Sequence, residues 1–536
     1  MKERLVEDWL SRINERGYEV PFCQTLIAKG YRVVRCGHSP IEHGKDVIAI
    51  APDGLVYCYQ LKSGDVAQTE LAKHLPQLNM LVEARPSHPS LPADFKYCPV
   101  LVTTGEYSPP AVSLVKELNG SWKYRSLPEL ALIGGRQLLA ELVSLSDDFW
   151  PVDAPALRQF RELYLVDGRG DFEVAQFAKF IAEIVGGPST PRELERKSAA
   201  ANLFASYLLG PFYEEADHWS IFRGWIVCAG AIARAGAQAE HDSAHWFPSF
   251  ELARNGGLTA LRALREEALG RDAFRVYQRE VDDYTRVRNT ITMAGAACAQ
   301  LIDQIEGADT DPNPILDRIT DFVTRGRFFF WGERAFSSFS TIIWLLDAVG
   351  LNEQANALLM TLIQSISQKN HPESEQPYDD PYVTEDESII RLLGRDDSCE
   401  KRSNRKSVQS YSLLALVLLA ARRNLRSQLE ALWPRISHVR LTRFRADAPI
   451  DLFSWHCDKG REEDLAFEQP QSWQCLREVA MRDDSERLPA ALREDPAFAL
   501  MFTIAYPHRI LLSLMKFLDE VIASATEGGG RRKLTE

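Results

Sequence analysis

Three polar side chains interrupt an otherwise apolar segment, residues 44–65, with the sequence GKDVIAIAPDGLVYCYQLKSGD. They are Asp46, Gln60 and Lys62. The intervening Pro52-Asp53-Gly54 is a turn signal, and a three-residue loop with Gly54 in the left-handed conformation predicts a hairpin with Asp46 directly opposite Gln60. Gln60 and Lys62 are two residues apart, so they share a face of that sheet. Because buried polar groups cost free energy, the patch either has a chemical task or lies on the solvated face of an edge hairpin.

These residue types suit the hydrolysis of a phosphodiester bond. That reaction needs a hard cation, an activated water and compensation of charge on the phosphate. Mg²⁺ (or Mn²⁺) takes carboxylate and carbonyl oxygens together with water, so Asp46 can supply a bridging carboxylate and Gln60 a second ligand oxygen. Lys62 can orient or deprotonate the attacking water and offset developing negative charge. The patch therefore predicts a metal-dependent catalytic site.

The elements that position this patch alternate between helix and strand up to about residue 150. Periodicity and turn residues predict helices over 20–29, 66–84 and 110–118, and strands over 31–36, 46–50, 55–61 and 97–103. Gly30 is predicted to cap the first of these helices. This order indicates an α/β sandwich around a mixed sheet.

The pattern changes after about residue 150, where strand signals nearly vanish and long amphipathic segments dominate. We interpret this part as all-α, so that the whole chain is of the α+β class. The expected division is 1–150, 151–310 and 311–526, followed by a disordered tail over 527–536. No convincing repeat of helical units is found.

Composition limits the classes of function. The chain has 536 residues, 45% of them hydrophobic, and a formal net charge of −13. This charge does not suit a general polyanion binder, so contacts with nucleic acid would come from local basic groups. No stretch is long enough to span a membrane and the charged N-terminus does not resemble a signal peptide, so we expect a cytoplasmic protein without membrane partners.

The patch also resembles a known family. An Asp, a hairpin and then Gln-x-Lys is the pattern of the Mrr-type restriction endonucleases, within the PD-(D/E)XK nuclease superfamily. Three further elements of that family occur in the expected order over roughly residues 15–145. They are Glu19, Leu26 and Gly30-Tyr31 in a helix that leads into a strand; Thr103-Thr104-Gly105 after a buried strand; and Ile133-Gly134 ahead of Leu138. The resemblance implies a restriction-endonuclease-like α/β fold for residues 1–150.

The resemblance also implies roles for individual residues. Glu19 would lie on the first helix near the metal, Asp46 would be the principal metal ligand, and Lys62 the catalytic lysine. Gln60 stands where most of the superfamily has an acidic residue, as it does in the Mrr type. This replacement removes one negative charge, so a one-metal site or modest metal affinity is expected.

Basic and amide groups near the patch are candidates for contacts with the substrate. Lys45 and His43 precede the hairpin, and Gln68 and Lys73 lie on the following predicted helix. The family often has a glycine-rich approach to its Asp, whereas this chain has only Gly44 there. The alternative for these side chains is a solvated surface without a ligand.

Two classes of function follow. The first is a Mg²⁺-dependent DNA endonuclease, the effector of a bacterial restriction or anti-phage defence system, whose helical region regulates, targets or oligomerises it. The second is a catalytically inactive nuclease fold that docks within a defence complex. RNA is an alternative substrate, because metal-assisted hydrolysis acts on the phosphate and not on the sugar. The acidic helical region favours a protein partner or self-association over direct DNA binding.

Overall fold

The computed structural model describes most of the chain, in two compact units. The described residues are 2–36, 45–86, 91, 95–151, 154–166, 168, 172–239, 241–270, 283–307, 313–326, 328–371, 409–455, 460–465, 472–482, 488–509 and 511–532. The first unit is Met1–Thr259 and the second is Ala260–Glu536. Each is described by itself below.

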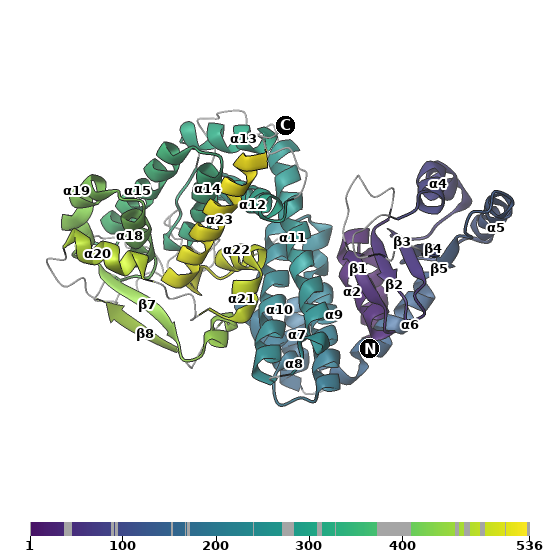
Figure 1. Cartoon of the computed structure of the whole chain (residues 1–536). Helices are drawn as coiled ribbons and strands as arrows, with labels where there is room; N and C mark the ends of the chain where they lie inside the picture. Colours follow the sequence, from purple (N-terminus) through teal and green to yellow (C-terminus); the bar gives the residue numbers. More distant parts are fainter. Residues whose placement is uncertain are drawn as a thin grey trace. The chain divides into compact units, whose positions relative to one another are not determined.

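The N-terminal region is built on a mixed five-stranded sheet with the order β1-β2-β3-β4-β5 (Figure 1). The first three strands are antiparallel neighbours, and β4 and β5 extend the sheet in parallel. The strands are Arg32–Cys36 (β1), Val47–Ile50 (β2), Val56–Lys62 (β3), Tyr97–Thr103 (β4) and Ala131–Ile133 (β5). The mixed sheet expected from the sequence is therefore confirmed.

The hairpin between β2 and β3 has the predicted register. Val47 pairs with Tyr59 and Ile50 with Val56, and the Ala51 N–H donates to the Leu55 carbonyl at 2.9 Å, which leaves a loop of three residues, 52–54. Gly54 has a φ of 83°, the left-handed conformation that this loop requires and that glycine adopts without strain. The Asp53 carboxylate accepts the Leu55 N–H at 3.0 Å, which stabilises the turn locally.

Helices cover both faces of this sheet. The helices of this region are Lys2–Arg12 (α1), Glu15–Ala28 (α2), Gln68–Lys73 (α3), Leu75–Glu83 (α4), Pro109–Tyr124 (α5) and Gly135–Ser146 (α6). One core joins apolar residues of the strands, such as Ile48, Cys58 and Leu101, to the apolar faces of α3, α4 and α5. On the other face, Phe22 of α2 packs edge-on against Tyr59 of β3. Side-chain alternation along β3 thus separates the two layers.

The first unit continues as an all-helical region. Its helices are Ala154–Tyr164 (α7), Val174–Val185 (α8), Pro191–Glu214 (α9), His218–Ala239 (α10) and Phe247–Gly270 (α11), the last of which the division between the units crosses. A capping box at Thr190 and Glu193 begins α9. Most residues of α9 and α10 are buried, as expected for helices that are packed on several sides.

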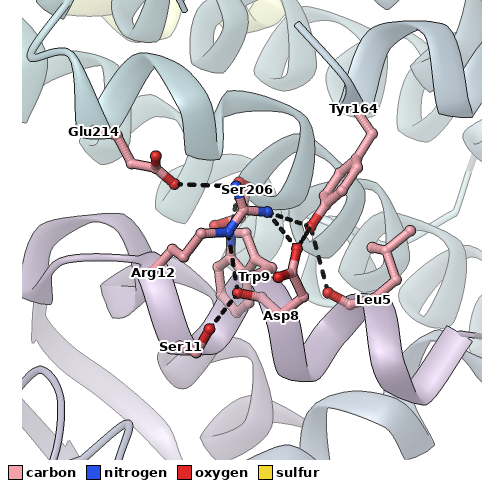
Figure 2. A network of polar contacts seen from close by, with 8 residues as sticks. All are labelled: Leu5, Asp8, Trp9, Ser11, Arg12, Tyr164, Ser206 and Glu214. Carbon is pink, nitrogen blue, oxygen red and sulfur yellow. Dashed lines mark hydrogen bonds and ion pairs between the residues drawn. The ribbon is translucent and has the colours of Figure 1, made fainter. Parts of the chain in front are cut away.

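The N-terminal helices are tied to this helical region by polar contacts (Figure 2). The Trp9 indole donates to the Ser206 carbonyl at 3.2 Å, and Arg12 on α1 lies 3.1 Å from the Tyr164 hydroxyl and 3.7 Å from the Glu214 carboxylate. Tyr164 also donates to Asp8 at 3.1 Å, and burial raises the pKa of its phenol to about 12. These contacts join α1 to α7 and α9.

The compact units differ from the division expected at residues 150 and 310. The physical reason is that α2, which packs on the sheet, also packs on α9 through buried polar contacts. The Ser206 hydroxyl donates to the Gly17 carbonyl at 2.7 Å, and Asn202 donates to Gln24 at 2.6 Å. The sheet and α7–α10 therefore belong to one unit.

The second unit is mostly helical, as expected, but its described residues also include three strands. Its helices are Asp283–Ile305 (α12), Asn313–Thr324 (α13), Phe336–Ala348 (α14), Asn352–Lys369 (α15), Leu413–Arg422 (α18), Arg426–Ile436 (α19), Trp473–Met481 (α20), Ala490–Glu494 (α21), Pro496–Ala505 (α22) and Leu512–Arg532 (α23). The strands Gln409–Ser410 (β6), Arg440–Ala446 (β7) and Gly460–Leu465 (β8) form one sheet. β7 and β8 are rich in charged residues and lack an apolar alternation, so the sequence pattern did not predict them.

The C-terminal tail also differs from expectation. α23 continues to Arg532, through most of the stretch that we expected to be disordered from residue 527. Residues 533–536 lie outside the described residues.

Candidate functional site

Lys62 ends strand β3, and its main chain is held by a tyrosine of helix α2. The Tyr18 hydroxyl donates to the Lys62 carbonyl at 2.8 Å and accepts the Lys62 N–H at 3.0 Å. Burial raises the pKa of Tyr18 well above its usual range, although the bond to the Lys62 main chain opposes that shift. The phenol therefore keeps its proton and can donate and accept at once. This double contact fixes the point from which the lysine side chain leaves the sheet.

The Lys62 amine lies beside a carboxylate of the same helix. Its Nζ is 3.5 Å from Oε1 of Glu15, and both side chains are partly exposed, at 23% and 36%. Asn14 caps α2 by accepting the Gly17 N–H, which places Glu15 in the first turn, where an acidic group interacts favourably with the helix dipole. The start of α2 thus brings both Glu15 and Tyr18 to the end of β3.

Asp46 reaches the same strand end from β2. Its N–H donates to the Tyr59 carbonyl at 2.9 Å, and its Oδ2 accepts the Leu61 N–H at 2.7 Å. The carboxylate therefore lies against the β3 main chain, next to the peptide that leads to Lys62. Asp46 is also close enough to Tyr18 to raise the pKa of the phenol. The structure thus brings Asp46 and the Lys62 main chain to one place, around Leu61 and Tyr18.

Gln60 is buried on the face of the sheet that α4 covers. It is 4% exposed, and its Nε2 donates to Oε1 of Gln77 at 3.3 Å. Its own Oε1 is buried and has no hydrogen-bond partner among the described residues. An unpaired buried carbonyl oxygen costs about 1–3 kcal/mol. This oxygen is therefore an unsatisfied acceptor inside the described part of the region.

The loop that follows Lys62 is clamped by the Thr-Thr-Gly element noted in the sequence. The Thr103 hydroxyl donates to the Gly64 carbonyl, and the Gly64 N–H donates to Thr104 Oγ1 at 2.9 Å. A Cβ on Gly105 would lie 2.4 Å from the Asp65 nitrogen, which explains why the third position is glycine. The element therefore holds the chain just after Lys62 in place.

Glu19 was predicted as the acidic residue of the first helix, and it lies on α2 with 4% of its surface exposed. Glu15, one turn earlier on the same helix face, is the carboxylate recorded beside Lys62. Neither Glu15 nor Tyr18 was predicted from the sequence. The spacing of Glu15, Tyr18 and Glu19 does place all three on one helix face in the sequence. It does not predict which strand that face contacts, so it could not assign Glu15 or Tyr18 to the site.

The predicted substrate-binding residues lie in different environments. Lys45 is 3% exposed and its Nζ donates to the Met80 carbonyl of α4 at 3.3 Å, so it does not lie on the surface as a phosphate contact would. Burial lowers the pKa of this amine. Lys73 is exposed on α3 and pairs with Glu70 at 3.1 Å, and Gln68 is exposed at the start of α3. His43 lies outside the described residues.

The donor set predicted for the metal, Asp46 and Gln60, suits a hard cation by its chemistry. It contains the Asp46 carboxylate and the unpaired Gln60 carbonyl oxygen, both of the oxygen type that Mg²⁺ prefers. Within the described ranges, no three side chains of the types His, Cys, Asp and Glu are grouped as a metal site would require. A bound ion would therefore keep several of its waters, as Mg²⁺ commonly does.

Comparison of the chain with family models, curated proteins and solved structures finds no match. In the described part of the chain, none of the helices combines the length and apolar character needed to cross a bilayer.

Proposed function

We propose that the N-terminal region is a metal-dependent endonuclease that hydrolyses phosphodiester bonds of DNA. The observation that carries the proposal is the meeting of Asp46, Tyr18 and Lys62 at the end of β3, where each contacts the main chain of residues 61–62 or belongs to it. The sequence resemblance to the Mrr-type nucleases gives these residue types their proposed chemistry. Mg²⁺ or Mn²⁺ is the proposed cofactor, held by Asp46 and Gln60, with Glu19 on α2 as a further proposed carboxylate ligand.

Each side chain has a proposed task. Lys62 donates hydrogen bonds to the attacking water or to a phosphate oxygen, and its charge offsets the charge that develops on the phosphate. Tyr18 and the Thr103-Thr104-Gly105 element position Lys62 without contacting the substrate. Glu15 restrains the amine when no substrate is bound. When bound, the metal ion would make water more acidic and polarise the phosphate.

The helical remainder of the chain is proposed to decide when and where the nuclease acts. Fusion of a nuclease region to a larger helical region is the arrangement expected of an effector in restriction or anti-phage defence. Its role would be to regulate, to target or to hold copies of the chain together. Two copies would suit cleavage of both strands of a duplex.

A cleavage assay on the full chain tests the proposal. Supercoiled plasmid DNA and end-labelled RNA are incubated separately with the protein in Mg²⁺, in Mn²⁺ and in EDTA. We expect nicking or cutting of DNA that requires the metal. Asp46→Asn keeps an oxygen that can accept the Leu61 N–H but removes the charge, and Lys62→Met keeps the length of the side chain but removes the amine. Each variant should cut at least about 100-fold more slowly.

Asp53→Asn is the matched control, because Asp53 also accepts a backbone N–H in the same hairpin but lies in the exposed turn. It should cut within twofold of the wild type. If the wild type cuts neither nucleic acid with either metal, the region is a docking module and the proposal fails. If the protein cuts RNA but not DNA, the proposal that DNA is the substrate is wrong. If Lys62→Met cuts at the wild-type rate, the assignment of the active site to the end of β3 is wrong.

A further inference from the structure

A cavity of about 410 Å³ lies in the second unit among four helices, α14, α15, α18 and α23. These helices pack on one another as neighbours in the fold. The residues that line the cavity are Trp344, Asp347, Asn352, Asn356, Arg423, Asp519, Ile522 and Ala523. The volume is within the range of about 300–1,000 Å³ typical of small-molecule sites, and spaces between bundled helices are a common place for them.

One arginine serves both carboxylates of this cavity. Nη2 of Arg423 lies 2.5 Å from Oδ2 of Asp347 and 3.5 Å from Oδ1 of Asp519. Asp519 is also 3.4 Å from Arg422, whose guanidinium further contacts Glu520 and the Ala480 carbonyl. Among the described residues, Asp347 therefore pairs with Arg423 alone, whereas Asp519 has two arginines. The lining residues carry two negative charges and one positive charge.

Asp347 lies where stability alone would not favour a carboxylate. It is the second-last residue of α14, at the negative end of the helix dipole, and its side chain is 23% exposed. Burial raises its pKa to about 6 despite Arg423, and Asp519 adds to the rise. Its second oxygen, Oδ1, has no partner among the described residues and is not sealed from solvent. A desolvated carboxylate with an open oxygen in a cavity is a typical feature of a binding site.

The remaining lining residues add two side-chain amides and an indole ring to the cavity. Asn352 and Asn356 lie one turn apart on α15, and Asn356 uses its oxygen to accept from Arg423 at 3.3 Å. Trp344 is 1% exposed, and its indole N–H has no acceptor among the described residues. Together with Ile522 and Ala523, the indole supplies apolar surface beside the polar groups.

We propose that this cavity binds a small organic cation, a protonated amine or amidine attached to a compact apolar body. The cationic group would donate to the open oxygen of Asp347, and the apolar body would lie against Trp344, Ile522 and Ala523. The excess of negative charge disfavours phosphates and carboxylates, which would meet two aspartates for one arginine that is already engaged. The proposal does not depend on nuclease activity of the N-terminal region.

Three ligands of one shape test the charge requirement on the full chain. Benzamidine is a flat amidinium, benzamide is its neutral counterpart and benzoate is the matching anion. Binding is measured by isothermal titration calorimetry at pH 7.5, supported by changes in tryptophan fluorescence. We expect benzamidine to bind at least about tenfold more tightly than benzamide, and benzoate not to bind detectably. A difference of tenfold corresponds to one charge-assisted hydrogen bond in a partly buried site.

Two variants test the location by different means. Asp347→Asn removes the open carboxylate, and Ala523→Trp fills the cavity while leaving its charges in place. Each should weaken benzamidine binding at least about tenfold. Asp321→Asn on α13 removes a carboxylate outside the cavity and should leave binding within twofold of the wild type.

Several results would overturn the proposal. It fails if benzamidine does not bind, if benzamide or benzoate binds as tightly, or if both cavity variants bind benzamidine like the wild type. Loss of folding in Asp347→Asn, detected by circular dichroism, would leave Ala523→Trp to decide the location.

Discussion

The end of strand β3 and the cavity among α14, α15, α18 and α23 combine the same types of side chain in different ways. Each has carboxylates, one basic group and at least one side-chain amide. At the strand end the polar groups bond to the main chain, as Asp46 does to Leu61 and Tyr18 to Lys62. In the cavity they bond to one another, as Asp347, Asp519 and Asn356 do through Arg423.

This difference has a physical consequence. A side chain that bonds to the main chain of a strand is positioned by the sheet, so its removal should affect chemistry more than architecture. Side chains that bond to one another are positioned only by the packing of their helices, so the removal of one leaves its partner buried and uncompensated. We therefore expect changes in the cavity to affect stability and pH dependence, and changes at the strand end to affect rate.

The largest expected effect is that of Asp347→Asn, in the cavity, on how the stability of the folded chain depends on pH. Burial raises the pKa of Asp347 from 3.8 to about 6, so the folded chain holds a proton there that the unfolded chain releases. The wild type therefore loses stability as pH rises from about 4 to 6. Asp347→Asn does not titrate and lacks this loss, which is at most about 3 kcal/mol for two pKa units.

The measurement is the difference in melting temperature between Asp347→Asn and the wild type from pH 4 to 8. As the pH rises from 4 to about 6, the melting temperature of the variant should increase relative to that of the wild type. Above about pH 6 the difference should stay constant. Asp321→Asn provides the control for a carboxylate elsewhere in the unit. A flat difference throughout, or a shift in the opposite direction, would contradict the environment described for Asp347.

The next largest effect is expected at the strand end, from Tyr18→Phe. The change removes both hydrogen bonds to the Lys62 main chain, while the ring still fills its buried position. We expect kcat to fall about tenfold with KM nearly unchanged, because the lysine side chain would start from a less defined position. Tyr97→Phe is the matched control. Tyr97 lies on β4 of the same sheet, away from Lys62, and its hydroxyl donates to the Val82 carbonyl of α4.

Both tyrosine variants should lose a similar amount of stability, about 1–2 kcal/mol, as judged by thermal unfolding. Only Tyr18→Phe should lose rate. Equal loss of rate in the two variants would show that Tyr18 acts only through general stability and does not position Lys62.

A smaller effect is expected from the ion pair between Glu15 and Lys62. The pair is partly exposed, and such pairs are worth no more than about 1 kcal/mol. Glu15→Gln should therefore change the cleavage rate by no more than about fivefold, and Glu15→Asp should restore part of the change. A loss of 100-fold in Glu15→Gln would instead make Glu15 a catalytic carboxylate.

The smallest effect distinguishes the two lysines proposed from the sequence as substrate contacts. Lys73 is exposed on α3, whereas Lys45 is buried and donates to the Met80 carbonyl. Lys73→Met should reduce the salt dependence of DNA binding by about one phosphate contact, and Lys45→Met should leave it unchanged. Titrations of labelled duplex at several salt concentrations, in EDTA to prevent cleavage, measure both. An equal reduction in the two variants would contradict the buried position of Lys45.

Local sequence signals predicted much of the N-terminal region. The Pro52-Asp53-Gly54 turn determined the register of the β2–β3 hairpin, because a short loop with one left-handed glycine permits few alternatives. The apolar strands and the mixed sheet followed from periodicity. The charged strands β7 and β8 could not be predicted in this way, because their sequences lack the apolar alternation on which a prediction from periodicity depends, although they pair with each other.

The sequence by itself determined which residues could carry chemistry near the hairpin, since Asp46, Gln60 and Lys62 are linked through one short turn. Only the tertiary structure decided that Tyr18, 44 residues away, anchors Lys62, and that Glu15 lies beside its amine. The cavity depends still more on tertiary structure, because Asp347 of α14, Arg423 at the C-terminal cap of α18 and Asp519 of α23 are far apart in the chain. A turn is governed by neighbouring dihedral angles, whereas the meeting of distant side chains is governed by how whole helices and sheets pack.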